Sequence, residues 1–507
     1  MKRDGMKRGL GAATAVVVVG LFAASCTKET VVFVERPLFE DPPAGANGFM
    51  GFESSAATSE GVTVCGNCHA GVQGNWSGTG HADAWQGLED SGHAQDFCRE
   101  CHSTGPLGNP PGNDAADGGW LSTGDARYYD VQCEACHGPG ETHLDDPGLF
   151  QPLAAIAVDT TYGCGECHQG DHHGFATEWL ESPHAVLVGF AAAREGCADC
   201  HNGKVTIQLW DPNANYEERD DGQPQAQVCA VCHDPHGSPY AANLRQPIQN
   251  VAITSHLCAQ CHNRRTEPDP GSSHGLEPHA PEADLLQGTA GWIPPGSFIG
   301  QDTIAGTHGS VANPKACAAC HVFPYTVTDE TTGEFVFNVT GHLFRPIPCV
   351  DAQGVPEPFD VTCGLSPAER SYESCTTAGC HGSEQAAFSA LTTKAAQVQA
   401  DADDLIALLA LVDPNLDAPG GEIDPEDPTF TVAEGAFFNY HLAIFGNAAF
   451  NTDNVLGSTT HNPFLVPSLL MESINIVQTT YGVSLPRTVG RDFEAEIRAE
   501  ISRANGY

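Results

Sequence analysis

The hydrophobic pattern is most regular in the last quarter of the chain, after residue 384. Apolar residues recur there at alternating steps of three and four, which places them along one face of a helix. These residues are Phe388, Leu391, Ala395, Val398, Ala402, Leu405, Leu409 and Val412. A heptad-like repeat of this kind predicts a long helix that packs against another helix.

A loop rich in Pro, Gly and Asp follows at 413–428. After it, Thr431 and Glu434 have the spacing of a capping box, in which each side chain bonds to the backbone N–H of the other residue. This pair predicts a second helix that continues to about residue 446.

Two further helices are predicted near the end of the chain. Asn462 and Pro463 suit the N-cap and first turn of a helix that ends near Gly482. A short last helix is expected over 491–504. We therefore expect 385–507 to form a helical C-terminal domain.

The region from 63 to 384 has few long periodic segments, and Thr326–Thr340 is its best candidate for a β-hairpin. A chemical pattern repeats here instead: nine times, two cysteines are followed at once by a histidine. Eight copies match CxxCH, the motif of covalent c-type haem attachment. The two thiols add to the haem vinyl groups, and the imidazole binds the iron from the proximal side.

The eight CxxCH copies give the following candidate residues. The haem-binding cysteines are Cys65, Cys68, Cys98, Cys101, Cys133, Cys136, Cys164, Cys167, Cys197, Cys200, Cys229, Cys232, Cys258, Cys261, Cys317 and Cys320. The proximal histidines are His69, His102, His137, His168, His201, His233, His262 and His321. Zinc knuckles, thioredoxin-type CxxC motifs and iron–sulfur runs do not place a histidine after every second cysteine.

The ninth copy, CTTAGCH, has two extra residues between Cys375 and Cys380, and His381 follows. Either both cysteines hold a haem, or Cys380 alone does and Cys375 pairs with Cys349 or Cys363. We favour the first alternative and expect nine haems c, with eight as the minimum. A disulfide between Cys349 and Cys363 is then expected, with two buried free thiols as the alternative.

About 35 residues per haem is too little for each unit to fold on its own, so the haems themselves must form the core. The count of 55 Gly and 35 Pro agrees with short loops around large flat cofactors. The expected fold is mainly α with much irregular structure: a haem-cored multihaem array over 63–384 and the helical segment after it.

The chain carries 64 acidic and 22 basic residues, a net charge of −42. This charge excludes nucleic acid and anionic lipid as electrostatic partners. It favours cationic redox proteins, and self-assembly stays possible. Adaptation to a salty habitat would explain the charge equally well.

The N-terminus has the pattern of a secretory signal, with basic residues before the apolar run Leu10–Ala24. Small residues lead into Cys26, as at a lipoprotein cleavage site, although Ala23 stands where leucine is usual. We expect a signal peptide at 1–25, a lipid on Cys26 that anchors the protein in a membrane, and an acidic Pro/Gly-rich tether at 26–62. The protein is then exported, to the periplasmic face of a membrane or to the cell surface. Ordinary cleavage nearby is the alternative.

Each six-coordinate iron needs a second ligand, and fourteen histidines lie outside the motifs. Only four Met are present, so bis-histidine ligation is expected, which implies low reduction potentials. The favoured distal ligands are His81, His93, His143, His184, His236, His256, His308, His342 and His461. His441 is either a ligand or a core residue, and His172, His173, His274 and His279 lie in polar loops and are expected to be spare.

These segments resemble the multihaem cytochrome c superfamily, which includes the tetrahaem carrier of ammonia oxidisers, pentahaem nitrite reductase and octahaem hydroxylamine oxidoreductase. The likeness covers most of 63–480 and rests on CEACHGPGETH (133–143), WLESPHA (179–185), CAVCHDPHG (229–237) and HNPFLVPSLL (461–470). It implies that His143 and His184 are distal ligands. The CxxCK motif of nitrite reductase is missing, so no catalytic residue can be transferred.

Two functions remain in view. The first is an exported electron carrier between membrane or periplasmic donors and a periplasmic or extracellular acceptor. The alternative is an oxidoreductase that acts on a small nitrogen or sulfur compound, such as hydroxylamine, nitrite or tetrathionate. That alternative needs one five-coordinate haem with an open distal side.

Overall fold

The computed structural model describes residues 39–505, with gaps at 106, 112–117, 271–275, 302–303, 378–379, 414–428 and 446–454. The chain divides into two units, Met1–Glu40 and Asp41–Tyr507. The expected signal peptide, Cys26 and most of the tether lie outside the described residues. Within the described part of the chain, no helix is both long and apolar enough to cross a membrane.

Each motif forms about one turn of helix. The turns are η2 (Val64–Asn67), α4 (Arg99–His102), α6 (Cys133–His137), α8 (Gly163–Cys167), α11 (Ala198–His201), α13 (Cys229–Cys232), η9 (Cys258–Gln260), α15 (Ala318–His321) and η12 (Glu373–Cys375). In most of them the N–H of the histidine donates to the carbonyl of the first cysteine, at 2.9 Å in the Cys65 motif. This turn gathers two sulfur atoms and one imidazole on one side of the backbone.

Short helices and loops join these turns. The α-helices are α2 (Ala70–Trp76), α3 (Gln86–Ser91), α5 (Gly119–Thr123), α7 (Glu141–Asp145), α9 (Phe175–Leu180), α10 (Gly189–Ala192), α12 (Gly203–Trp210) and α14 (Glu282–Gln287). The 3-10 turns are η1 (Thr58–Glu60), η3 (Gly80–Asp83), η4 (Asp96–Cys98), η5 (Ala126–Tyr128), η6 (Pro183–Ala185), η7 (Ala241–Asn243), η8 (Ile253–Ser255), η10 (Ile299–Gln301) and η11 (Thr307–Gly309).

The two predictions for residues 325–363 are confirmed. Strands β1 (Tyr325–Thr328) and β2 (Phe335–Val339) pair antiparallel, with Tyr325 opposite Val339. Cys349 and Cys363 form a disulfide. Cys375 therefore has no disulfide with either of these cysteines. This agrees with the alternative in which both Cys375 and Cys380 hold the haem.

The C-terminal segment is a bundle of α16 (Glu384–Val412), α17 (Val432–Ala443), α18 (Leu456–His461), α19 (Leu465–Tyr481) and α20 (Phe493–Asn505). Five of the eight heptad positions are buried in its core, and the other three are partly buried. The predicted seam is thus confirmed. The core also takes in Leu285, Ala290, Ile299 and Ile304, so the bundle and the motif region share one hydrophobic cluster.

The helix boundaries test the capping predictions. The capping box of Thr431 and Glu434 is present, although α17 ends at Ala443, one turn earlier than expected. The side chain of Asn462 accepts the N–H of Leu465 at 2.9 Å, as a cap does, but α19 begins at Leu465 and not at Pro463. Asn462 also ends α18, so one residue serves two helices.

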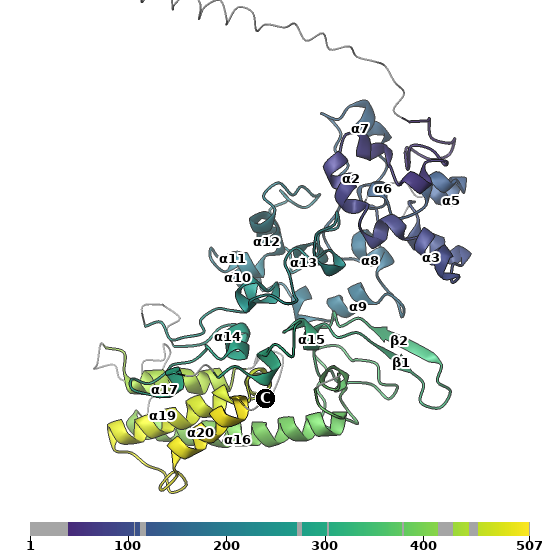
Figure 1. The fold of residues 1–507 in the computed structure, drawn as a ribbon. Coiled ribbons are helices and arrows are strands. Elements are labelled where there is room, and N and C mark those ends of the chain that lie inside the picture. Colours follow the sequence, from purple (N-terminus) through teal and green to yellow (C-terminus); the bar gives the residue numbers. More distant parts are fainter. Residues whose placement is uncertain are drawn as a thin grey trace, which may run out of the picture. The chain divides into compact units, whose positions relative to one another are not determined.

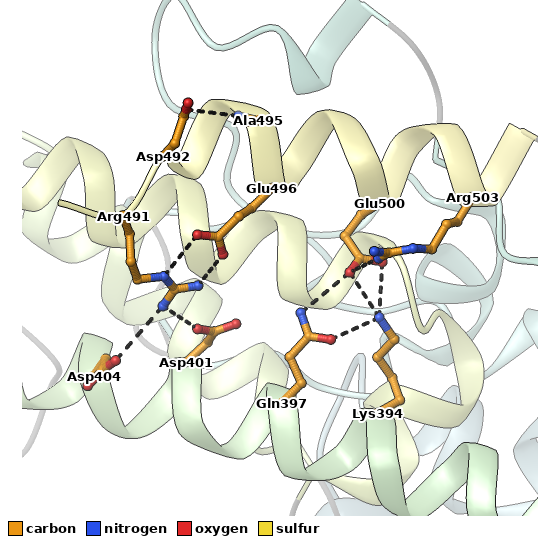
Figure 2. A network of polar contacts seen from close by, with 10 residues as sticks. All are labelled: Lys394, Gln397, Asp401, Asp404, Arg491, Asp492, Ala495, Glu496, Glu500 and Arg503. Carbon is orange, nitrogen blue, oxygen red and sulfur yellow. Dashed lines mark hydrogen bonds and ion pairs between the residues drawn. The ribbon is translucent and has the colours of Figure 1, made fainter. Parts of the chain in front are cut away.

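A network of charged side chains joins α20 to α16 (Figure 2). The Arg491 guanidinium bonds to Asp401 at 2.8 Å and to Glu496 at 2.6 Å. Lys394 reaches Glu500 at 3.0 Å. Asp401 and Glu500 are 3% and 2% exposed, so these carboxylates depend on their cationic partners.

We predict that Arg491→Met lowers the free energy of unfolding by about 3 kcal/mol, because it leaves the buried Asp401 carboxylate without its guanidinium. The matched control is Arg498→Met, which removes an exposed pair with Glu494 on the same helix and should cost less than about 0.5 kcal/mol. Urea unfolding followed by far-ultraviolet circular dichroism measures both. Equal losses in the two variants would contradict the prediction.

Candidate haem-binding sites

Nine pairs of histidine rings stand out in the structure, and each pair contains one motif histidine. Their ring centres lie 5.9–6.3 Å apart. In motif order, the pairs are His69–His143, His102–His173, His137–His236, His168–His81, His201–His279, His233–His342, His262–His184, His321–His461 and His381–His308. We number the corresponding motifs as sites 1 to 9.

This spacing fits two imidazoles on opposite sides of one iron. A metal–imidazole bond is about 2 Å long and the bonding nitrogen lies roughly 1 Å from the ring centre, so two such rings have centres about 6 Å apart. The two cysteines of the same motif lie beside each pair, where thioether bonds would hold the edge of the ring. The residues present therefore fit a haem at all nine motifs, including the stretched one.

The second nitrogen of many of these rings is held by the protein. Nδ1 of His102, His137, His233 and His321 faces a backbone carbonyl at 2.7–2.9 Å. On the distal side, His308 and His461 do the same, facing Thr460 and Gly457. Because a carbonyl only accepts, Nδ1 carries the proton and Nε2 keeps the lone pair that a metal needs.

Burial also keeps these rings in the metal-binding form. It lowers the pKa of His184 to about 3 and the pKa values of His168, His321 and His342 to about 4. These imidazoles are therefore neutral at physiological pH.

Seven of the nine expected distal histidines face a motif histidine, and two do not. Among the described residues, neither His93 nor His256 has a ring contact with a motif histidine. His93 is exposed in the loop after α3. His256 is buried, but its Nδ1 accepts the N–H of Cys258 at 3.2 Å, which commits the ring to the local turn.

His173 and His279, which were expected to be spare, take these places at sites 2 and 5. The other extra histidines have different surroundings. The half-buried His441 packs on Phe437 with ring centres 4.3 Å apart, and His172 stacks on Phe335. His274 lies outside the described residues.

Thiols of different motifs lie next to each other and order the sites in space. Within hydrogen-bonding reach are the pairs Cys65–Cys133, Cys101–Cys167, Cys164–Cys229, Cys200–Cys261 and Cys258–Cys317. Electrostatic interactions join Cys136 to Cys164, Cys232 to Cys258, and Cys320 to Cys375. Together they give one row, sites 1-3-4-6-7-8-9, with site 2 beside site 4 and site 5 beside site 7.

The same hydrogen bonds occur twice along this row. The indole N–H of Trp76 donates to Val131 O at 3.0 Å, and that of Trp179 donates to Gln227 O at 2.8 Å. The same two acceptor residues donate their own N–H groups to the carbonyls of His81 and His184, at 3.0 and 3.1 Å. The segments that carry sites 1-2-3 and 4-5-6 thus share a local arrangement that repeats after three sites.

This repeat is the sequence signal that identifies the two missed histidines. The partner of site 2 follows the motif of site 4, and the partner of site 5 follows the motif of site 7. Both histidines thus follow the motif that lies two sites further along the chain. Local spacing around a single motif does not show this correspondence.

Two buried carboxylates shape the loops that carry histidines paired with motif histidines. Glu178 accepts the backbone N–H groups of Thr340 and His342, at 2.6 and 2.7 Å, and so holds His342 toward site 6. Glu134 accepts N–H groups from Met50, Gly51 and Gly140, the last in the loop before His143. Burial raises the pKa of Glu134 to about 7, against these hydrogen bonds, which favour the ionised form.

Site 7 differs from sites 2, 3, 6 and 8 in the partner of its motif histidine. Nδ1 of His262 faces the carboxylate of Glu282 at 3.3 Å. Burial alone would lower the pKa of His262, but Glu282 outweighs it and the pKa is raised. Burial likewise opposes the ionisation of Glu282, yet its interaction with His262 holds the pKa of Glu282 at about 2.

Comparisons with known proteins agree with these sites. Residues 64–138 match the family model for cytochrome c554 and c-prime, and residues 223–267 match that for a doubled CXXCH motif. The multiheme cytochrome MtrA of Shewanella baltica (strain OS185) is 29% identical over 160 residues, which is 27% of this chain and 44% of MtrA. The match thus spans less than half the length of that curated relative.

Among solved structures, the outer cell wall cytochrome OcwA superposes with a TM-score of 0.50 at 16% identity. The superposition covers 82% of this chain and 98% of OcwA, and it shows a likeness of fold. The motifs, the paired histidines and these matches define a protein that binds haem covalently. The chain is a multihaem c-type cytochrome.

The assignment of site 5 can be tested with two single variants. His279→Ala should convert one haem to a five-coordinate high-spin form, because it removes the ring opposite His201. The control His256→Ala should leave every haem low-spin. Electron paramagnetic resonance of the oxidised proteins separates the two results, and a high-spin signal from His256→Ala alone would reverse the assignment.

Proposed function

We propose that this cytochrome binds nine haems c, each between its motif histidine and the distal histidine paired with it, and conducts electrons along the row they form. The continuous order of sites 1-3-4-6-7-8-9 carries the proposal. Haems attached to these adjacent thiols would be close neighbours along the row. Electrons can then pass from each haem to the next without leaving the protein.

The pairing of all nine motif histidines favours conduction over turnover of a small molecule. A histidine on each side of the iron closes both axial positions and holds the same geometry in the ferric and ferrous states. A reductase or oxidase would need one site with an open distal side. The nine pairs give no support to the alternative of a nitrogen- or sulfur-compound oxidoreductase.

The net charge of the chain and the ends of the row indicate which redox partners bind and where. The net charge of −42 favours cationic redox proteins and makes their association sensitive to salt. Sites 1 and 9 end the row, and sites 2 and 5 each adjoin one other site. These four are the places where electrons would enter or leave.

We further propose export and a lipid on Cys26, which would hold the cytochrome at a membrane or cell surface. The basic residues, the short apolar run and the small residues before Cys26 support this proposal. Haem c is attached outside the bacterial cytoplasm, which agrees with export.

Removal of single haems tests the proposed order of the sites along the row. A haemochrome assay should give nine haems for the wild type. Ser77→Cys places a thiol for a ruthenium photosensitiser at the exposed end of α2, the helix that follows the motif of site 1. With Cys229→Ala and Cys232→Ala, which remove site 6, light should rapidly reduce only the haems of sites 1–4, because the interactions between described residues join the two halves of the row through site 6.

The matched control removes site 5, beside the row, through Cys197→Ala and Cys200→Ala. There, all eight remaining haems should be reduced rapidly. Both variants must first show eight haems and wild-type circular dichroism. Rapid reduction of all eight haems without site 6 would contradict the proposed order.

A second test concerns the anchor. Cys26→Ser should release a fully haem-loaded cytochrome into the soluble fraction, because haem attachment needs export but not the lipid. Fractionation with a haem stain measures this. A variant that stays with the membrane after a salt wash would show that something other than the lipid holds it.

A further inference from the structure

Glu282 lies where several sites meet. Site 7 adjoins sites 5, 6 and 8 through its cysteines Cys258 and Cys261. The Glu282 carboxylate, besides its hydrogen bond to His262, interacts electrostatically with His461 of site 8 and is itself felt by His279 of site 5. Within the described part of the chain, Glu282 interacts with imidazoles and thiols of the haem sites.

Two backbone contacts of α14 fix the position of this carboxylate. Ala283 N donates to His262 O at 3.0 Å, so α14 begins directly against the motif of site 7. Two residues further, Asn462 donates its side-chain amide to Leu285 O at 2.9 Å. Ala283 and Leu285 are buried, and Leu285 belongs to the core of the helical bundle. The bundle thus holds α14 in place and Glu282 against His262.

A charged acceptor acts on the iron ligand differently from a carbonyl. When Nδ1–H donates to a carboxylate, the imidazole gains electron density and becomes a more basic ligand. A more basic ligand stabilises ferric iron, which carries the higher charge. The carbonyls that face Nδ1 of His102, His137, His233 and His321 are also acceptors, but they lack the full negative charge.

We propose that Glu282 lowers the reduction potential of the haem at site 7. This haem is then reduced after its neighbours at sites 5, 6 and 8. The proposal rests on the haem ligation proposed above. Electrons would then reside on sites 5, 6 and 8 and cross site 7 one at a time. Glu282 is a tuning residue for the cofactor, and it touches neither a substrate nor the iron.

The test compares the reduction potentials of three full-length holoproteins. Glu282→Gln keeps an oxygen acceptor at the same place but removes the charge. It should favour the ferrous form of one haem about tenfold, the scale on which changes beyond the direct ligands act, which is about 59 mV for a one-electron couple. Spectroelectrochemical titration should show one of nine components moving to higher potential.

Asp284→Asn is the matched control. It removes the same charge from the same helix, where Asp284 bonds only locally to Thr289, so all components should stay within the error of the wild type. If both variants shifted the reduction potential equally, the effect would be one of general charge, and the proposal would be overturned. Unchanged reduction potentials in Glu282→Gln would overturn the proposal as well.

Two measurements separate this inference from the proposed ligation. Haemochrome assay and low-spin resonance of the wild type test the ligation without reference to Glu282. Thermal unfolding of Glu282→Gln tests a merely structural role, which would lower stability or haem content and leave the potential of site 7 unchanged. The resonance of one low-spin haem should also shift in Glu282→Gln, because the electron density on its imidazole changes.

Discussion

The fold depends on the requirement that two histidine rings stand about 6 Å apart at each motif. This requirement joins segments that are distant in sequence: His233 meets His342, and His321 meets His461, each more than 100 residues further along the chain. With about 35 residues per motif, the polypeptide builds only small hydrophobic clusters over this region, such as the one around Trp179 and Ile207. The cofactor bonds and the paired ligands take the part that hydrophobic packing plays elsewhere, and the helices between them stay short.

The parts of this structure that local chemistry determines could be predicted from the sequence. The cysteine motifs, the Cys349–Cys363 disulfide, the hairpin and the capping box at Thr431 all depend on residues close together in the chain. The choice between His93 or His256 and His173 or His279 depends instead on which motifs become neighbours in space. His256 looked favourable because it precedes a cysteine, yet its ring is used by the backbone of that same turn. The start of α19 was misplaced for a related reason, since Asn462 serves two helices at once.

The helical bundle has a second role beyond covering the end of the motif region. It supplies His461 to site 8, and its Asn462 fixes the helix that carries Glu282. Buried carboxylates act similarly elsewhere, where Glu178 and Glu134 gather backbone N–H groups around the loops of distal histidines. Acidic residues are thus used in two ways: most lie at the surface and set the net charge, while a few are buried and position ligands.

The repeated hydrogen bonds of Trp76 and Trp179 imply that the row has a natural unit of length. The same indole–carbonyl contact lies inside each unit, where it joins the segment after the first motif to the segment before the third. Descendants of such a chain could therefore differ in reach by whole multiples of three cofactors, much as solenoid proteins differ by whole repeats. Duplication of this segment would most readily change the distance over which electrons are carried, and not the chemistry of the sites.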